Sequence, residues 1–367
     1  MRPVSAGEPL PLLYEKWAGE LLGGPIPRES MATCDRCAMV RPEGLAGDPP
    51  RGEHYFDPAV RCCTYLPELR NFLVGGILSD EHPAAAPGRA TVEKRIAASV
   101  SVTPLGLAQT PVYSLLYKNS EESFGRTRGL VCPHLLPEGR CGIWRHRNYV
   151  CATWFCKHVR GALGRSFWID AIHPLLRMVE GELARWCVLE LHPSDDVLRQ
   201  LVANASWDQG EPTVTGAAID GRVEPKEHAK LWGDWRGREI EFFRRCAEMV
   251  APLTWEQVTA IGGTRVRAHA LIAQQAYRRL LSDDIPPALE AGRVDLVRIR
   301  NVTTRVQTYS GYDPLDVPQS VMEALGYFDG RPTEEALAMI AEELAVRVEP
   351  DLLRKLVDFE LLVPPGK

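Results

Sequence analysis

The chain has 367 residues, 45% hydrophobic and 25% charged, with a formal net charge of −5. This length predicts two or three packed units, and the composition is that of a soluble globular protein. No apolar run approaches the roughly 18 residues of a membrane span, and the N-terminal residues carry acids and a tryptophan where a signal peptide has an unbroken apolar core. We therefore expect a cytoplasmic protein.

In the first half of the chain, the spacing of apolar residues predicts mostly helices. A short helix is expected around residues 12–22, and helical or mixed segments over residues 64–78 and 92–102. The run from Pro111 to Tyr117 is predicted to be a buried strand. Proline and glycine predict loops at residues 38–61 and 80–90.

The second half is predicted to be helical, with a small β component near its end. Helical patterns cover residues 166–200, 231–250 and 265–281, and residues 207–222 are expected to form a loop. After residue 294, two short strands (296–300 and 305–309) precede three helices (317–328, 333–344 and 350–361). Thr333 is expected to cap its helix and Pro350 to take a first helical position. Two strands with three helices is the layout of a small winged-helix unit.

Cysteines are concentrated in the first 156 residues, which hold eight of the ten. The segment from Cys132 to His158 alone contains four cysteines and three histidines, too many for an ordinary core. Thiolates are soft ligands that suit tetrahedral Zn²⁺ or an iron–sulfur cluster. The candidate ligands are Cys34, Cys37, Cys62, Cys63, Cys132, Cys141, Cys151 and Cys156.

How these eight cysteines are divided stays open at this point. One site could use Cys132, Cys141, Cys151 and Cys156, or four ligands that include one or both of Cys62 and Cys63, and eight thiolates also permit two sites. Cys151 and Cys156 are about 140° apart on an ideal helix, so one must lie at a helix end or break. In an exported protein, ten cysteines could instead form five disulfides. Cys187 and Cys246 stand alone and are not expected to bind metal.

One stretch of the cysteine-rich segment resembles a known family. Residues Cys141 to Cys151, CGIWRHRNYVC, are similar to the Cys-x-Ile-Tyr-x-x-Arg-Pro-x-x-Cys signature of the YkgJ family of cysteine-cluster proteins, described as zinc- or iron-chelating domains. Trp144 stands where the signature has tyrosine and Asn148 where it has proline. The resemblance covers about residues 34–160. It implies a metal-binding module, and it singles out Arg147, at the arginine position of the signature, as a cofactor-binding residue.

Charge differs between the cysteine-rich segment and the tail. Residues 118–165 contain nine basic and three acidic residues, a surplus that could compensate thiolate charge. Residues 291–367 contain nine basic and thirteen acidic residues, which disfavours nucleic-acid binding. The tail has a weak resemblance to the peptide-binding PqqD-like modules, which implies a protein or peptide partner.

The sequence therefore predicts a mainly α (α+β) protein in three parts. These are a cysteine-cluster metal-binding module (1–165), a helical domain (166–288) and a winged-helix-like domain (289–367). We expect an iron–sulfur cluster, possibly [4Fe–4S], with Zn²⁺ as the alternative. The protein is either an enzyme that acts on a protein or peptide, such as one resembling a lysine methylase, or a structural zinc-binding assembly protein. No reaction can be assigned from the sequence, because it shows no nucleophile triad, phosphate loop or catalytic carboxylate pair.

Overall fold

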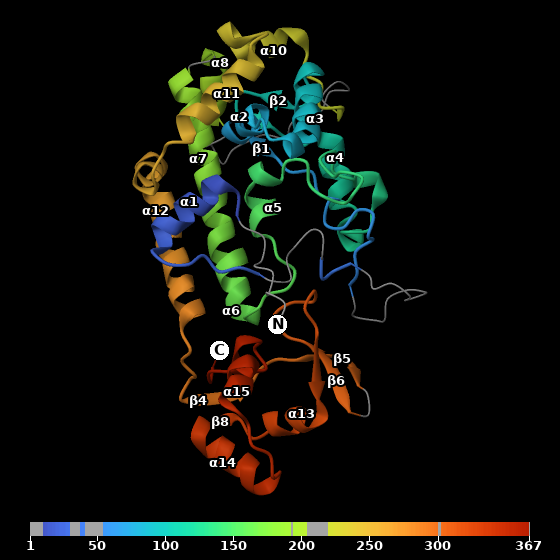
Figure 1. The fold of residues 1–367 in the computed structure, drawn as a ribbon, viewed down its shortest axis with the longest axis vertical. Coiled ribbons are helices and arrows are strands. Elements are labelled where there is room, and N and C mark those ends of the chain that lie inside the picture. Colours follow the sequence, from blue (N-terminus) through green and yellow to red (C-terminus); the bar gives the residue numbers. More distant parts are fainter. Residues whose placement is uncertain are drawn as a thin grey trace.

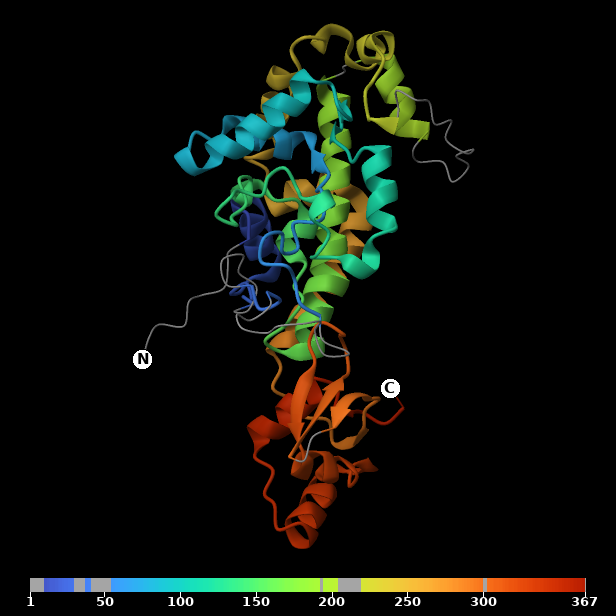
Figure 2. The ribbon, with the colours of Figure 1, turned by 90° about the vertical axis from the view of Figure 1, so that its right-hand side faces the viewer.

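The computed structural model describes residues 10–29, 37–40, 54–191, 194–203, 219–299 and 302–366. About 55% of the chain is helical and 11% is strand, which confirms a mainly α chain with small sheets. The molecule is elongated, with a helical body at one end and the C-terminal residues at the other (Figures 1 and 2). Among the described helices, none is both long and apolar enough to cross a bilayer.

Helices form most of the body. They are α1 (Leu12–Leu22), α2 (Asn71–Ser79), α3 (Ala86–Ala97), α4 (Pro111–Lys118), α5 (Tyr149–Thr153), α6 (Gly161–Arg165), α7 (His173–Leu191), α8 (Asp195–Ala203), α10 (Pro225–Trp232), α11 (Glu239–Val250) and α12 (Trp255–Leu281). A π-helical segment, Ser166–Ile172, leads directly into α7. Three short antiparallel strands, β1 (Leu69–Arg70), β2 (Val102–Thr103) and β3 (Gly106–Leu107), pair in the order β1-β3-β2.

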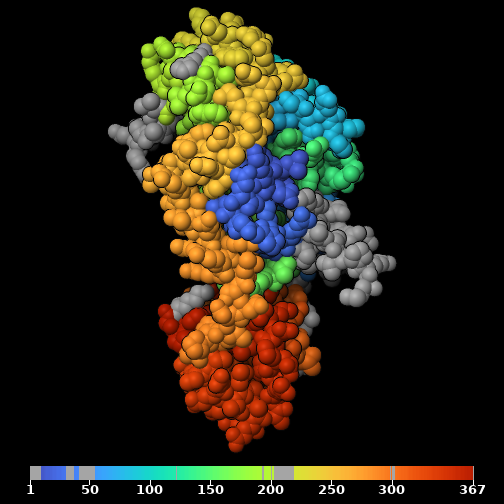
Figure 3. All heavy atoms as spheres, turned by 60° about the vertical axis from the view of Figure 1, so that its left-hand side comes forward, coloured from blue at the N-terminus to red at the C-terminus, as the bar shows by residue number. Residues whose placement is uncertain are grey.

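One hydrophobic core holds this body together. It takes buried side chains from residue 10 to residue 280, among them the fully buried Trp17, Trp168 and Trp232. Helices α7 and α12 run side by side, and α1 lies across α12 (Figure 3), where Tyr277 of α12 donates a hydrogen bond to the Pro25 carbonyl. This core takes residues from both sides of position 165.

Helices α2 and α11 approach each other closely within this core. A β-carbon added to Gly75 of α2 would lie 1.8 Å from the carbonyl oxygen of Phe243, so only glycine fits there. On the other side of the core, α12 bends at Gly263, which has φ 64° and ψ −150°. A residue with a side chain rarely adopts this conformation. Glycines thus set both the close helix crossing and the bend.

A second, separate core belongs to the C-terminal residues. It includes Leu289, Phe328, Ile340 and Leu362. Its helices are α13 (Gln319–Leu325), α14 (Thr333–Glu343) and α15 (Pro350–Asp358). Its strands form two antiparallel sheets, β8-β4-β9 and β5-β6-β7. The strands are β4 (Ala288–Ala291), β5 (Asp295–Ile299), β6 (Thr303–Gln307), β7 (Leu315–Pro318), β8 (Asp329–Pro332) and β9 (Leu362–Val363). We call residues 285–363 the C-terminal unit.

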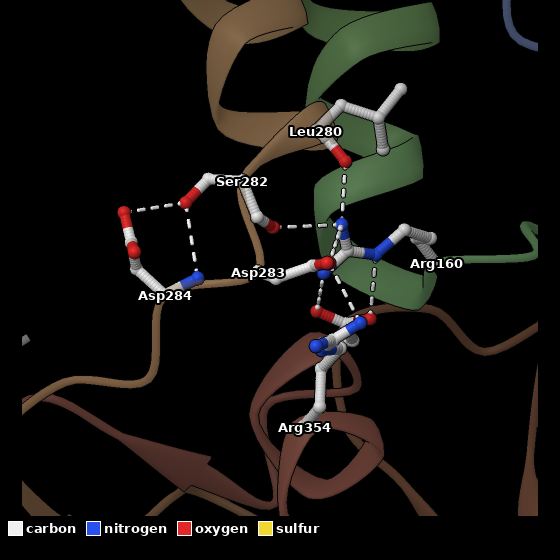
Figure 4. A network of polar contacts seen from close by, with 7 residues as sticks. Arg160, Leu280, Ser282, Asp283, Asp284 and Arg354 are labelled. Carbon is white, nitrogen blue, oxygen red and sulfur yellow. Dashed lines mark hydrogen bonds and ion pairs between the residues drawn. The ribbon is translucent and has the colours of Figure 1, made fainter. Parts of the chain in front are cut away.

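Arg160 joins the two cores (Figure 4). Its guanidinium donates to both carboxylate oxygens of Asp358 on α15, each at 2.8 Å, and to the carbonyls of Leu280 and Ser282 where α12 ends. Asp283, in the same connection, pairs with Arg354 at 2.6 Å. The Asp358 side chain is 9% exposed, so this ion pair is largely removed from water. Arg160 therefore fixes the C-terminal unit against the helical body.

Some predicted elements are wrong in informative ways. Residues 111–118 form the helix α4 and not a buried strand, because the Thr110 side chain accepts the Tyr113 amide and Pro111 occupies the first turn. Thr333 does not cap α14, since its hydroxyl donates to the Pro286 carbonyl. The helix at residues 12–22 and the position of Pro350 are confirmed.

Candidate metal centre

Seven of the eight predicted cysteine ligands line two adjoining cavities. The larger, of about 420 Å³, is lined by Cys62, Cys63, Cys132, Cys141 and Cys151. The smaller, of about 80 Å³, is lined by Cys37 and Cys156, and shares Cys62, Cys63 and Cys141 with the larger one. Cys34 falls in residues 30–36, which lie outside the described ranges. We refer to the two spaces together as the cysteine cavity.

The cysteines are brought together by contacts between segments far apart in the sequence. The Cys132 amide donates to the Cys63 carbonyl at 2.7 Å, which joins the 62–63 pair to the central stretch. Leu135 and Cys141 form an antiparallel bridge across a turn that contains Gly139 at φ 79°. The amide of Cys151 in α5 donates to the side chain of Asn148. Cys156 lies beyond the end of α5, as the five-residue spacing requires.

Backbone amides are directed at several of the sulfurs. The His134 amide lies beside the Cys132 sulfur and lowers the pKa of that thiol, while the Leu135 amide donates to the Cys132 carbonyl at 3.0 Å. The amides of Met39 and Ile143 act in the same way on Cys37 and Cys141. These three amides each lie two residues after the cysteine and are folded back towards its sulfur. Such bonds stabilise a thiolate more than a thiol and tune the electronics of a bound metal.

Without a bound cation, the surroundings of these cysteines disfavour the charged thiolate form relative to the thiol. Burial raises the pKa of Cys132 to about 12, and burial followed by the charges of Cys132 and Cys141 raises that of Cys151. For Cys62, the hydrogen bond with Cys63 is the main reason for a raised pKa. Cys62 and Cys151 are still exposed, because solvent reaches them through the cavity while protein atoms crowd their other sides. A bound cation reverses this preference and deprotonates coordinating thiols.

Among the described residues, four cationic side chains lie near the cysteines. Arg147, which the sequence singled out, is 4% exposed, and its guanidinium lies 3.2 Å from the centre of the Trp144 ring. Its charge lowers the pKa of Cys141 and Cys151 against the effect of burial. Arg61 acts in the same direction on Cys62, and Lys157 on Cys156. The fourth is Arg95, near Cys132. The predicted basic surplus thus includes charges that act on the sulfurs.

Aromatic side chains form the remaining wall of the larger cavity. They are Tyr65, Tyr117, Phe124, Trp144, Trp154 and Tyr312. Trp154 is 44% exposed and marks the open side. Tyr312 comes from the C-terminal unit, where its ring lies 6.4 Å from that of Phe56 in the body. The cavity is therefore lined by residues of both the helical body and the C-terminal unit.

The other two cysteines lie elsewhere, as expected. Cys187 of α7 and Cys246 of α11 are fully buried in the helical core, with the Cys187 sulfur 3.9 Å from the Cys246 carbonyl oxygen. Neither lines the cysteine cavity. They behave as small apolar residues that fill the interface between two helices.

Sequence reasoning missed several residues of the site. Arg61 precedes the double cysteine and could have been found from that position, and His134 stands two residues after Cys132. Arg95, whose charge interacts with Cys132, and Tyr312, which lines the larger cavity, had no local signal, because only the tertiary fold brings them near the cysteines. His173 of α7 also lines the larger cavity and was not predicted.

The side chains around the cavity do not stand at the distances of a formed metal site. Across the described ranges, no three histidine, cysteine, aspartate or glutamate side chains converge closely enough to hold a metal ion as they stand. The donor set nevertheless fits a thiolate-bound metal, because amides already point at three sulfurs and cations lie beside them. Comparisons with protein-family models, curated proteins and solved structures found no match for this chain.

Proposed function

We propose that this chain holds an iron–sulfur cluster in the cysteine cavity and uses it on a protein or peptide partner. The observation that carries the proposal is that seven predicted ligand cysteines line two adjoining cavities. Backbone amides on the sulfurs of Cys37, Cys132 and Cys141 support it, because they favour the thiolate form that a cluster requires.

The size and openness of the site favour a working cofactor over a structural zinc. A structural zinc site is closed by four ligands and leaves no open position. Here the larger cavity encloses about 420 Å³ and is reached by solvent at Cys62 and Cys151. That space exceeds the needs of one closed ion. It leaves room beside the metal for a reacting group.

The chain's own residues have clear parts in such a site. A bound cluster supplies electron transfer or a Lewis-acidic iron. Arg147 and Arg61 offset the negative charge of the thiolates, and the stacking of Arg147 on Trp144 fixes its position. The aromatic side chains exclude water from their own faces of the cavity, which strengthens the charge interactions there.

The C-terminal unit is the part that we assign to partner binding. In its sequence, this unit resembles the peptide-binding PqqD-like modules. Strand β5 is at the edge of its sheet, with Leu296 59% and Ile299 70% exposed, and an edge strand can pair with an extended peptide. A peptide array probed with the full chain and with a Leu296→Lys variant tests this. Equal binding by both, or none by either, contradicts it.

Metal analysis of protein purified without oxygen tests the cluster. We expect matched iron and acid-labile sulfide, with a brown visible absorption. Cys141→Ser and Cys151→Ser should lower the bound metal and the melting temperature, because binding energy at such a site is also folding energy. Cys187→Ala and Cys246→Ala are the matched controls and should keep the metal. Full metal content and unchanged melting in both serine variants would refute the site, and colourless protein with zinc would make it structural.

A further inference from the structure

His134 lies within the cysteine cavity but was not among the predicted ligands. It is 2% exposed and lines the larger cavity together with Cys132 and Cys141. Its backbone is held on both sides, because its amide donates to the Cys132 sulfur and its carbonyl accepts the Gly142 amide at 2.7 Å. The residue therefore has a fixed place between two candidate ligands.

The hydrogen bonds of Thr91 determine which nitrogen of His134 carries the proton. The Thr91 hydroxyl has a single hydrogen, and it donates to the Gly88 carbonyl at 2.7 Å. The same oxygen lies 2.7 Å from Nδ1 of His134, so it must accept a hydrogen there. Nδ1 is then the protonated nitrogen, and Nε2 carries a lone pair on the other side of the ring.

That second nitrogen has no partner in the part of the chain that the structure describes. Nε2 is buried and makes no hydrogen bond there. A buried acceptor without a partner is rare in a native protein and calls for a water, an ion or a ligand. In metalloproteins, a ligating histidine commonly binds metal through one nitrogen while the other donates to a fixed acceptor. His134 and Thr91 already have this arrangement.

We propose that Nε2 of His134 is a ligand of the metal centre, beside the thiolates of Cys132 and Cys141. The proposal rests on the metal centre proposed above and changes its chemistry. A neutral imidazole in place of a thiolate makes the centre less negative by one charge. Histidine ligation also raises the reduction potential of an iron–sulfur cluster. The site would then be a mixed nitrogen and sulfur site.

Two other histidines provide a comparison. His158 is also buried, with neither ring nitrogen bonded among the described residues, but it lines neither part of the cysteine cavity. His173 lines the larger cavity, and its Nδ1 lies 2.9 Å from the Thr153 hydroxyl. It stands on α7 against Tyr149, and the Thr153 hydroxyl donates to the Tyr149 carbonyl at 2.7 Å, so Nδ1 of His173 also carries its proton; the side chain is only half-buried, however. Of these three histidines, His134 alone combines a fixed proton with a buried, unbonded nitrogen at the cysteine cavity.

Spectroscopy of the metal-loaded full chain tests the assignment. For an iron cluster, pulsed EPR of reduced protein labelled with ¹⁵N-histidine should show a directly bound nitrogen. For zinc, X-ray absorption should show a nitrogen at about 2.0–2.1 Å beside sulfurs at about 2.3 Å. His134→Gln should remove this nitrogen, and His134→Cys should replace it with sulfur and lower the reduction potential. Thr91→Val should weaken metal affinity about 10–100-fold.

His82→Gln is the control, because His82 is exposed and lies outside the cysteine cavity. It should leave the nitrogen signal unchanged. Two results would refute His134 as a ligand without refuting the metal centre. One is metal bound by sulfur alone in the natural protein, and the other is a nitrogen signal that persists in folded His134→Gln. Nε2 would then hold only water. Natural protein that binds no metal refutes the centre itself and this ligand with it.

Discussion

Glu180 of α7 makes the stability of this protein depend on pH in a way that can be isolated. The residue is 1% exposed, and its Oε1 accepts hydrogen bonds from the Tyr14 hydroxyl and the Tyr149 amide, each at 2.5 Å. Its Oε2 is buried without a hydrogen-bond partner in the described ranges. Burial is the main reason that the pKa of Glu180 rises from 4.5 to about 7.

The size and sign of the effect follow from this rise. A rise from 4.5 to about 7 corresponds to about 3 kcal/mol, since one pH unit is worth about 1.4 kcal/mol. The folded state binds the proton more tightly than the unfolded state. The contribution of Glu180 to the free energy of unfolding is therefore complete below pH 4.5 and is lost as the pH rises to about 7. Because the Glu180 side chain is buried, solvent does not screen this effect.

Glu180→Gln tests this reasoning, because glutamine resembles the protonated acid and does not titrate. We expect the variant to gain about 3 kcal/mol relative to the natural protein between pH 4.5 and 7.5, whatever its stability at the lower pH. Urea unfolding at a series of pH values measures the difference. Glu190→Gln, at an exposed position of α7, should run parallel to the natural protein. Parallel curves for Glu180→Gln as well would refute the argument.

Two further substitutions test the packing. Arg160→Met should lower the free energy of unfolding by about 3 kcal/mol, because it leaves the Asp358 carboxylate largely buried and unpaired. A double-mutant cycle with Asp358→Asn should show that the two losses are coupled. Additive losses would contradict the ion pair. Gly75→Ala should lower the free energy of unfolding in urea by about 3 kcal/mol, since the added carbon collides with the Phe243 carbonyl. At Gly19 an added carbon would meet no atom within 4 Å, so Gly19→Ala should stabilise α1 by up to about 1 kcal/mol. Equal effects of the two alanines would refute the close crossing.

Local patterns predicted several helices well and failed where tertiary contacts decide. The amphipathic segment 12–22 and the proline at position 350 follow local rules, and both are confirmed. The strand predicted from Pro111 to Tyr117 was wrong. Its apolar run suggested a buried segment, yet α4 has no buried residue and Leu115 is 63% exposed. A cap at Thr110 outweighed β propensity there. The hydroxyl of Thr333 donates to the carbonyl of Pro286, 47 residues away, a contact that no local sequence pattern predicts.

The candidate site shows the same division. Cysteine spacing was enough to select residues that the fold then places around one cavity. It was not enough to divide them into sites, because which sulfurs become neighbours depends on contacts such as that between Cys132 and Cys63. The role that we propose for His134 required Thr91, which lies 43 residues away in the sequence. No periodicity connects those two positions.

Tyr312 belongs to the C-terminal unit but lines the cysteine cavity, and this position has a thermodynamic consequence. Tyr312 forms part of the cavity wall, and Asp313 lies 3.9 Å from Lys157, next to Cys156. A ligand that shifts this loop when it binds to the C-terminal unit must change the affinity of the cavity for its own ligand. By linkage, the cavity's ligand changes the affinity of the distant surface by the same factor. Loading of the cavity and capture of a partner are then reciprocal measurements of one coupling free energy.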